Sequence, residues 1–243
     1  MKLIKYLFWA IWRSWFYTLV FILTVTLAPV LLVLMLRAPW YGALYFVGRH
    51  FWATPILYGM GFLPRIKKHQ RLETSKSYVL IANHTSMMDI MLMFYISKTP
   101  FVFVGKKELG DLPIFGYFYK RVAILVDRNS PESRKAVYAS AKERMDRGLS
   151  ICIFPEGGVP DEKVVLAPFK DGAFRLAIDY QIPLVPMIFY DCKKRFPFRF
   201  FSGKMGIMRA EVFPFISTEG YTQEQRSELK EKTYRFMLEK LTR

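Results

Sequence analysis

Short apolar runs alternate with segments of helical periodicity from residue 75 onward. The runs predict six strands, at 78–82, 101–104, 122–126, 150–154, 184–190 and about 210–216. Several are rich in Val and Ile and apolar throughout, which is typical of strands buried on both faces. Strands that alternate with helices over about 170 residues indicate an α/β layer fold.

Two of the intervening helices carry clear start signals. A helix at 131–147 has Ser130 as its N-cap and Pro131 at its first position. A second helix, at 222–241, opens with a capping-box pattern. Because no internal repeat, low-complexity stretch or long linker interrupts the pattern, we expect one domain at 73–243.

The N-terminal region has a different pattern. The 23 residues at 14–36 carry no charge, and that length can cross a hydrocarbon core as a helix. It is too long for a signal peptide, and no small-x-small cleavage site follows it. Pro29 could divide it, so a spanning helix and a re-entrant hairpin both remain open. A second apolar stretch, 39–64, is interrupted by Arg49 and His50 and is typical of an interfacial segment.

The net charge of +16 is concentrated in two segments that are rich in aromatic residues. Residues 1–72 contain nine basic and no acidic residues, and 193–209 contain six basic and no acidic ones. Such patches suit nucleic acid or an anionic membrane surface, and the uncharged N-terminal run favours the membrane. We therefore expect 1–72 to form membrane-associating helices, with anionic membrane lipid and not nucleic acid as the partner.

Charge and cysteine usage also bear on location. The larger basic cluster follows the first apolar run, which favours a main domain on the cytoplasmic side, at a bacterial inner membrane. Cys152 and Cys192 lack metal-ligand spacing and fit a reducing compartment.

The stretch "ANHTSMMDI" follows the first predicted strand and contains His84 and Asp89. Two residues five apart on one helix point about 140° from each other. They can meet if His84 lies in the loop after the strand and Asp89 in the first turn of a helix capped by Ser86. Ser86-x-x-Asp89 also reads as a capping box, so a role for Asp89 at the helix N-terminus alone is equally compatible.

Further motifs follow in order along the chain. They are Lys106-x-x-Leu109-x-x-x-Pro113-x-x-Gly116, "FPEG" at 154–157, "APFKDGAF" at 167–174 and "IPLVPMI" at 182–188. Together with His84 and Asp89, their order and spacing closely resemble the glycerolipid acyltransferase family over about residues 75–216. The resemblance implies a mixed sheet flanked by helices, joined to an N-terminal membrane-embedded helical segment.

The resemblance also implies a reaction and roles for the pair. His84 would be the general base and Asp89 its orienting carboxylate, with no acyl-enzyme intermediate. A fatty acyl group would pass from coenzyme A or acyl carrier protein to the sn-2 hydroxyl of lysophosphatidic acid, giving phosphatidic acid. This phospholipid biosynthesis would need no further cofactor and no metal.

The same likeness assigns an acceptor site. Glu156 and Gly157 would hold the acceptor, because a carboxylate can accept from a hydroxyl and a glycine backbone allows close approach. Lys106 occupies the family's basic position for a phosphate-bearing acceptor. Without such a site, the first two residues would form an ordinary turn and Lys106 would be a solvated side chain.

One position departs from the family pattern. The family continues its glutamate-glycine pair with threonine and arginine, and that arginine is linked to acceptor phosphate binding; this chain has Gly158 and Val159. Backbone N–H groups at Gly158 could bind the phosphate instead. Candidate replacement cations are Lys163, Lys170 and Arg128, with Lys170 in the family-like "FKDG" stretch as the first choice.

The missing arginine leaves a second acceptor open, such as a lyso-aminolipid without a glycerol phosphate. A membrane-anchored, non-catalytic lipid-binding protein is the third interpretation. The histidine, aspartate and glutamate of the motifs argue against it, since a protein that only binds has no need of a base.

Overall fold

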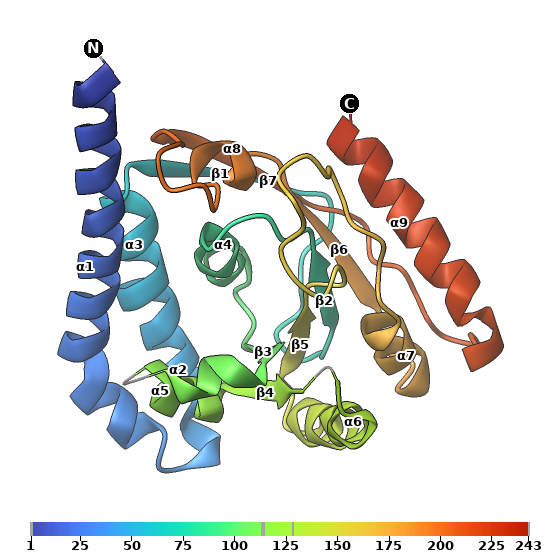
Figure 1. The fold of residues 1–243 in the computed structure, drawn as a ribbon. Coiled ribbons are helices and arrows are strands. Elements are labelled where there is room, and N and C mark those ends of the chain that lie inside the picture. Colours follow the sequence, from blue (N-terminus) through green and yellow to red (C-terminus); the bar gives the residue numbers. More distant parts are fainter. Residues whose placement is uncertain (1, 113–114, 128, 243) are drawn as a thin grey trace. The chain divides into compact units, whose positions relative to one another are not determined.

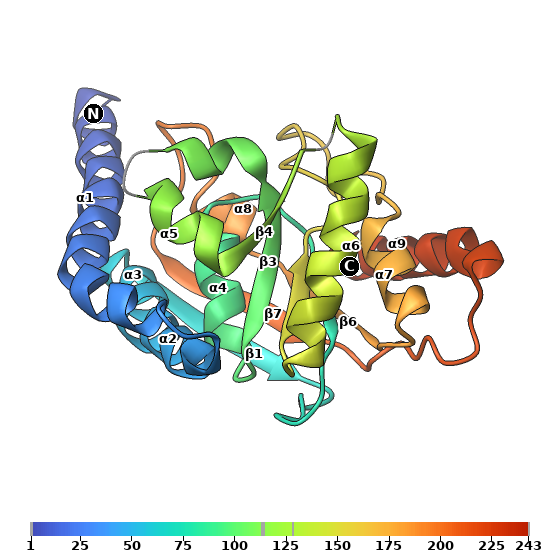
Figure 2. The ribbon, with the colours of Figure 1, turned by 90° about the horizontal axis from the view of Figure 1, so that it is seen from below.

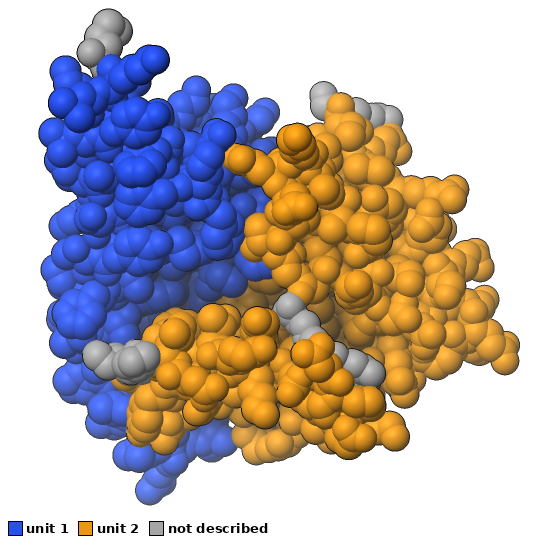
Figure 3. All heavy atoms as spheres, in the orientation of Figure 1, with its two compact units in different colours: residues 1–67, 84–100, 189–211 blue, residues 68–83, 101–188, 212–243 orange. Residues whose placement is uncertain are grey.

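The computed structural model describes residues 2–112, 115–127 and 129–242, which form two compact units (Figure 3). Unit 1 comprises residues 1–67, 84–100 and 189–211, and unit 2 comprises 68–83, 101–188 and 212–243. The units therefore alternate along the chain.

A parallel sheet forms the centre of unit 2, with strand order β6-β2-β5-β3-β4. Val79 lies opposite both Ile151 and Leu184, and Phe103 lies opposite both Cys152 and Ala123. The strands are β2 (Val79–Ala82), β3 (Phe101–Lys106), β4 (Ala123–Val126), β5 (Ser150–Ile153) and β6 (Leu184–Phe189). Five of the six predicted strands are thus confirmed to within two residues.

The helices of unit 2 lie between these strands and after the last strand of the chain. They are the short η3 (Lys107–Asp111), α5 (Phe115–Val122), α6 (Pro131–Asp146), α7 (Gly172–Asp179), the short η4 (Gln223–Gln225) and α9 (Arg226–Thr242). The predicted cap of α6 is confirmed, since Ser130 Oγ accepts from the Ser133 N–H at 3.0 Å. The capping box of Thr222 and Gln225 is also present, at the start of η4. Figures 1 and 2 both show α6 and α7 on the same side of the strands.

Antiparallel pairing makes the sheet mixed, as predicted. Leu184 forms an antiparallel bridge with Ile216, and the Phe213 N–H donates to the Pro186 carbonyl at 3.0 Å. The last strand, β7, spans Gly206–Val212, about four residues earlier than predicted. Pro214 lacks an N–H group, so a strand cannot extend its hydrogen-bond ladder through that position.

Unit 1 contains a strand that the sequence analysis missed. β1 (Phe62–Lys68) is the neighbour of β7 in the sheet order. Its sequence, FLPRIKK, contains a proline and three cations, so it lacks the apolar run by which we recognised the other strands. Unit 1 also holds α4 (Met88–Ile96) and the one-turn helix α8 (Cys192–Arg195).

The N-terminal region is a helical hairpin. α1 runs from Lys2 to Leu34 without a break at Pro29, and it is long and apolar enough to cross a membrane. The chain reverses after Leu34 into four short helices, of which α2, η2 and α3 pack against α1. They are η1 (Ala38–Trp40), α2 (Tyr41–Val47), the π-helix η2 (Gly48–Ala53) and α3 (Thr54–Gly59). A division of the apolar run at Pro29 is therefore wrong.

The charged interruption in the second apolar stretch has a structural explanation. Arg49 donates to the carbonyls of Phe94 and Tyr95, at 3.0 and 3.2 Å. These carbonyls belong to the last turn of α4, where a helix has unpaired acceptors and a negative dipole end. Arg49 thus joins the hairpin to α4, while many apolar side chains of the hairpin remain exposed.

Candidate active site

His84 and Asp89 meet as predicted. His84 lies in the loop after β2, and Asp89 is the second residue of α4. His84 Nδ1 is 2.9 Å from Asp89 Oδ2. The carboxylate is fully buried, whereas the imidazole is 19 % exposed. With Nδ1 bonded to the carboxylate, Nε2 is the ring nitrogen that can exchange a proton with a substrate.

The same carboxylate oxygen also serves the start of the helix. Asp89 Oδ2 accepts from the backbone N–H groups of Thr85 and Ser86, at 2.6 and 2.8 Å. One oxygen atom therefore both contacts His84 and accepts from the backbone N–H groups before α4. Three donors around Oδ2 compensate for the burial of the charge and fix the carboxylate against His84.

Ser86 has a different role from the predicted one. The N-cap residue of α4 is Met87, and the Ser86 hydroxyl accepts from the Met88 N–H at 3.1 Å. It donates at 2.6 Å to the carbonyl of Phe196, which lies 110 residues away in the chain. Ser86 thus connects two segments, namely the loop that contains His84 and the segment after α8. No local sequence signal could have shown this contact.

The second oxygen of Asp89, Oδ1, differs from Oδ2 in its hydrogen bonding. Oδ1 is buried and has no hydrogen-bond partner among the residues that the structure describes. Burial, followed by the charge of Asp89, raises the pKa of the fully buried Cys192 thiol well above its ordinary value. Cys192 therefore stays protonated and cannot act as a thiolate nucleophile.

Glu156, Gly157 and Lys170 lie together in unit 2, after the end of β5. Glu156 is 6 % exposed, and its Oε2 accepts from the Ala167 N–H at 2.8 Å. The Lys170 N–H donates to the Pro155 carbonyl at 2.7 Å. These bonds join the "FPEG" and "APFKDGAF" motifs, so the glutamate also fixes the loop.

Gly157 is needed for its backbone conformation and for space. Its φ of +77° favours glycine, and a Cβ there would lie 3.2 Å from Cγ of Lys170. Lys170 thus passes directly over the Gly157 backbone. Gly158 follows in the same turn, with ordinary φ.

Lys106 is the last residue of β3, at the carboxyl edge of the sheet. β3 and β5 are parallel neighbours, so this edge also carries the Glu156 loop. Lys106 Nζ is 3.5 Å from Glu108, and its side chain is 53 % exposed. Of the other sites considered, Arg128 and Pro113 lie outside the described residues, and Lys163 is exposed in the loop before α7.

Within the described ranges, no group of three His, Cys, Asp or Glu side chains could hold a metal ion. The predicted site residues thus form two groups. His84 and Asp89 lie in unit 1, and Lys106, Glu156, Gly157, Gly158 and Lys170 lie in unit 2.

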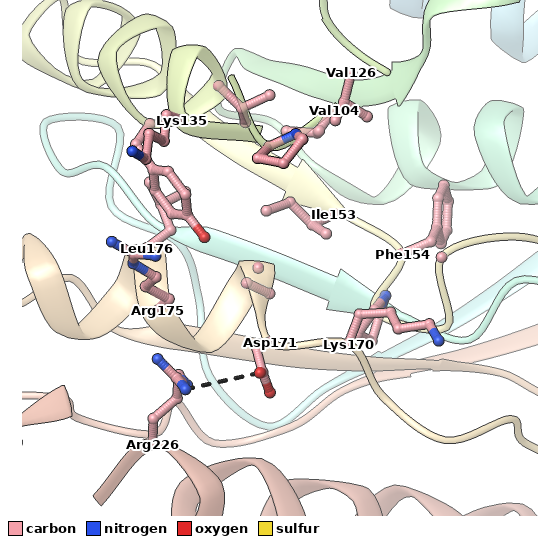
Figure 4. A pocket seen from close by; sticks show the side chains of 17 residues that line it. Val104, Val126, Lys135, Ile153, Phe154, Lys170, Asp171, Arg175, Leu176 and Arg226 are labelled. Atoms are coloured by element: carbon pink, nitrogen blue, oxygen red, sulfur yellow. Dashed lines mark ion pairs between the residues drawn. The ribbon is translucent and has the colours of Figure 1, made fainter. Parts of the chain in front are cut away.

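Unit 2 also contains a cavity of about 720 Å³ that the sequence analysis did not predict. Gly157 and Lys170 line it, and helices α6, α7 and α9 contribute most of the remaining polar groups (Figure 4). The sequence could show that α6 is a helix, but not which of its positions face the strand ends.

The chain was compared with known proteins. The family model described as Acyltransferase matches residues 64–190. A human protein named 1-acyl-sn-glycerol-3-phosphate acyltransferase beta is 33 % identical over 173 residues, covering 68 % of this chain and 59 % of its own length. A protein from Haemophilus influenzae, named 1-acyl-sn-glycerol-3-phosphate acyltransferase, is 30 % identical over 190 residues, covering 77 % and 72 %.

The chain spans 50 to 63 % of the length of the first four curated relatives. The crystal structure of the 1-acyl-sn-glycerophosphate (LPA) acyltransferase from Thermotoga maritima matches with a TM-score of 0.78 at 18 % identity. The match covers 100 % of this chain and 98 % of that one, and confirms the fold.

Proposed function

The chain belongs to the glycerolipid acyltransferase family, and we propose that it transfers a fatty acyl group from a thioester to the sn-2 hydroxyl of lysophosphatidic acid, giving phosphatidic acid. The hydrogen bond between His84 and the buried Asp89 is the observation that carries this proposal. A histidine oriented by a carboxylate is the arrangement that general-base catalysis requires. The names of the similar proteins indicate the acceptor.

The reaction follows from this geometry. His84 Nε2 takes the proton of the acceptor hydroxyl while the oxygen attacks the thioester carbonyl carbon. The C–S bond then breaks, and the leaving thiolate takes the proton from the imidazolium. Asp89 stabilises the imidazolium between these two transfers.

Chain connectivity places each group of site residues shortly after a strand of unit 2. β2 and β5 are neighbouring parallel strands of unit 2. His84 comes two residues after the end of β2, and Glu156 comes three residues after the end of β5. In open α/β sheets, ligands bind beyond the carboxyl ends of the strands. We therefore assign acceptor binding to Glu156 and Gly157.

The direct test uses the purified protein with an acyl thioester and a panel of lysolipids, and identifies the product by mass. We expect phosphatidic acid from lysophosphatidic acid. Equal turnover of a lyso-aminolipid without phosphate would favour the second acceptor class, which the Gly158–Val159 departure leaves open. No acylated product from any lysolipid would support the non-catalytic interpretation.

Substitution of two lysines should weaken binding of the acceptor more than binding of the acyl donor. A phosphate dianion needs cationic partners or oriented backbone donors when it leaves water. Because Lys106 and Lys170 flank the Glu156 loop, Lys106→Ala and Lys170→Ala should each raise the KM for lysophosphatidic acid. Loss of a charge-assisted contact should raise this KM by about 10-fold or more. The KM for the acyl donor should change less. Unchanged acceptor kinetics in both variants would remove the phosphate assignment.

Membrane association rests on the composition of α1 and on the surface of unit 1. Large apolar side chains are exposed along the hairpin and in the loop after α8, including Phe198, Phe200 and Phe201. Basic residues accompany them in both segments. Monomeric soluble proteins rarely expose apolar patches on this scale, and aromatic and basic side chains together suit the headgroup layer. We therefore propose an anionic lipid surface as the partner, on the cytoplasmic side of a bacterial inner membrane.

Vesicle flotation tests this proposal. We expect tighter binding to vesicles containing phosphatidylglycerol than to phosphatidylcholine alone, with the difference reduced by salt because charges are screened over about 10 Å at 0.1 M. Lys194→Ala and Lys204→Ala should each weaken the anionic preference by about fivefold. The exposed Lys232→Ala on α9 is the control. Equal binding to both vesicle types would contradict the anionic preference.

A further inference from the structure

Strands β1 and β7 of unit 1 lie side by side and expose one face of the pair (Figure 1). On β1, Leu63, Arg65 and Lys67 are exposed at every second position. On β7, Arg209 and Glu211 alternate with buried residues. Side chains two positions apart on a strand point to the same side, so these groups form one row on each strand.

Four of these side chains, together with Tyr190, line a cavity of about 340 Å³, which we call the β1–β7 groove. They are Arg65, Lys67, Arg209 and Glu211. Glu211 lies 3.9 Å from Lys67, and among the described residues it is the only carboxylate that lines the groove. Arg65 has no hydrogen bond or ion pair with another described residue. The groove therefore holds more positive charge than its own residues neutralise.

Arg209 is fixed in place before any ligand binds. Its backbone N–H and its Nε donate to Asp191 Oδ2 at 2.9 and 2.8 Å, and its Nη2 donates to Asp191 Oδ1 at 2.9 Å. Asp191 is 5 % exposed, whereas the Arg209 side chain is 63 % exposed. An anion that binds to the exposed side of this guanidinium loses little side-chain entropy, because the group is already immobilised.

Protection of the sheet edge explains only part of this charge. β1 is the last strand at one end of the sheet order, and cations and a proline on such a strand prevent its pairing with another chain. β7, however, has neighbouring strands on both sides. Arg209 therefore has no edge to protect, and its position across from β1 points to a ligand.

The two strands run in the same direction. The Gly206 N–H donates to the Gly61 carbonyl at 3.0 Å, and the His69 N–H donates to the Val212 carbonyl at 2.9 Å. The first bond joins the starts of the strands, and the second joins their ends. The exposed rows of the two strands therefore begin at the same end of the groove.

The beginning of the groove is apolar and adjoins a surface that we assign to the membrane. Leu63, near the start of β1, is 55 % exposed. A Cβ at Gly61 would lie 2.8 Å from Met205, so the exposed Met205 also lies at this end. The residues before Met205 include the exposed phenylalanines of the 198–201 loop. An apolar section followed by charged groups matches the order of acyl chain, phosphate and headgroup in a phospholipid.

We propose that the β1–β7 groove binds the headgroup of an anionic phospholipid of the bilayer. The phosphodiester lies between Arg65 and Arg209, a headgroup hydroxyl donates to Glu211, and the acyl chains extend past Leu63. The residues of the proposed active site do not line the groove. The bound lipid is thus a ligand that the protein does not consume, and its binding does not depend on the proposed acyl transfer.

The carboxylate of Glu211 discriminates among phosphate compounds. A phosphomonoester carries about 1.5 to 2 negative charges at pH 7, and the carboxylate repels them. A phosphodiester carries a single negative charge, and a glycerol headgroup adds hydroxyl donors for the carboxylate. Glu211 therefore disfavours free phosphate and lysophosphatidic acid in this groove and favours a lipid such as phosphatidylglycerol.

Binding of a short-chain lipid tests the site directly. Dihexanoylphosphatidylglycerol is titrated into the full-length, detergent-solubilised protein by calorimetry, with protein-free micelles as the blank. Arg65→Ala and Lys67→Ala should each weaken saturable binding about 3- to 10-fold, because a charge-assisted contact is lost at a partly solvated position. Lys68→Ala is the matched control, since Lys68 points to the opposite face of β1 and does not line the groove.

A second titration, with inorganic phosphate, distinguishes the lipid headgroup from free phosphate. The protein should bind the lipid more tightly than phosphate, and Glu211→Gln should narrow this preference because the repulsion is removed. Phosphate that binds as tightly as the lipid would overturn the inference in favour of a free anion. Lipid binding that is not saturable, or that Arg65→Ala and Lys68→Ala weaken equally, would show only a general attraction between charged surfaces and would also overturn it.

Kinetics separate this groove from the acceptor site. Arg65→Ala should leave kcat and the KM for lysophosphatidic acid unchanged in detergent micelles. An increased KM for lysophosphatidic acid would assign the groove to the acceptor and overturn the inference. If no lysolipid is acylated but Arg65-dependent lipid binding persists, the proposed function fails and the phospholipid site stands.

Discussion

His84→Ala should lower kcat for acyl transfer by about 10²–10⁴-fold, the usual contribution of a positioned base. The backbone N–H groups of Thr85 and Ser86 still donate to Asp89 in this variant, so the start of α4 should be preserved. The measurement is the rate of phosphatidic acid formation beside the thermal unfolding midpoint. His69→Ala, at an exposed histidine of unit 2, is the control and should retain full activity.

Asp89→Asn separates the two roles of the carboxylate. An asparagine oxygen at the Oδ2 position can still accept from Thr85 and Ser86, so the start of α4 should be preserved. The neutral amide cannot stabilise an imidazolium as an anion does. We therefore expect kcat to fall, though by less than in His84→Ala, with a small decrease in the unfolding midpoint. Full activity in Asp89→Asn would mean that Asp89 only fixes the helix start.

The strands of unit 2 could be predicted because each is an apolar run within its own short stretch of sequence. Val79–Ala82 and Leu184–Phe189 are buried at every position, and the sequence shows them as uninterrupted apolar runs. Ser130 and Pro131 likewise mark the start of α6 within two residues. Such signals depend on the backbone and side chains of one short stretch, which the sequence contains in full.

Elements that depend on distant partners were predicted less well. β1 has a proline and three cations in seven residues, and its partner β7 follows about 140 residues later in the chain. Arg49 interrupts an apolar stretch, and the sequence does not show that it binds the carbonyls at the end of α4. In both cases the stabilising groups come from another part of the chain.

The candidate site shows the same division. The His84–Asp89 bond spans five residues, and a loop followed by a helix start was enough to predict it. The capping alternative could not be decided from spacing, because one oxygen satisfies both arrangements. The cavity was missed because Tyr138 and Arg175, from different helices, have ordinary helical surroundings in sequence and meet only after folding.

Arg13 is the residue whose structural role differs most from its sequence context. The sequence places it before an uncharged run, where a basic residue is expected to flank a membrane segment. In the structure it is only 2 % exposed. Its Nη2 lies 2.6, 2.9 and 3.1 Å from the carbonyl oxygens of Pro197, Arg199 and Ser202. The guanidinium also lies 3.9 Å from the centre of the Phe196 ring.

These contacts connect α1 to the loop of the proposed base. Trp12, next to Arg13, has its ring centre 5.4 Å from that of Phe196. The Phe196 carbonyl in turn accepts from Ser86, two residues after His84. Residues 12, 13 and 16 are thus part of the core of unit 1, and a deletion of the N-terminal segment would remove core residues as well as membrane contacts.

Arg13→Ala should therefore destabilise the protein by about 2–4 kcal/mol, because buried carbonyl groups lose their donor. For a chain of this size, the unfolding midpoint in detergent should fall by roughly 5–15 °C. Arg13→Lys should recover little, since an ammonium cannot reproduce the planar contact with Phe196 or reach the three carbonyls together. Lys5→Ala, at an exposed position of α1, is the control. An unchanged midpoint in Arg13→Ala would show that apolar contacts alone hold α1 against the 196–203 loop. A lowered midpoint, with faster proteolysis of that loop, would show that Arg13 connects the loop to α1.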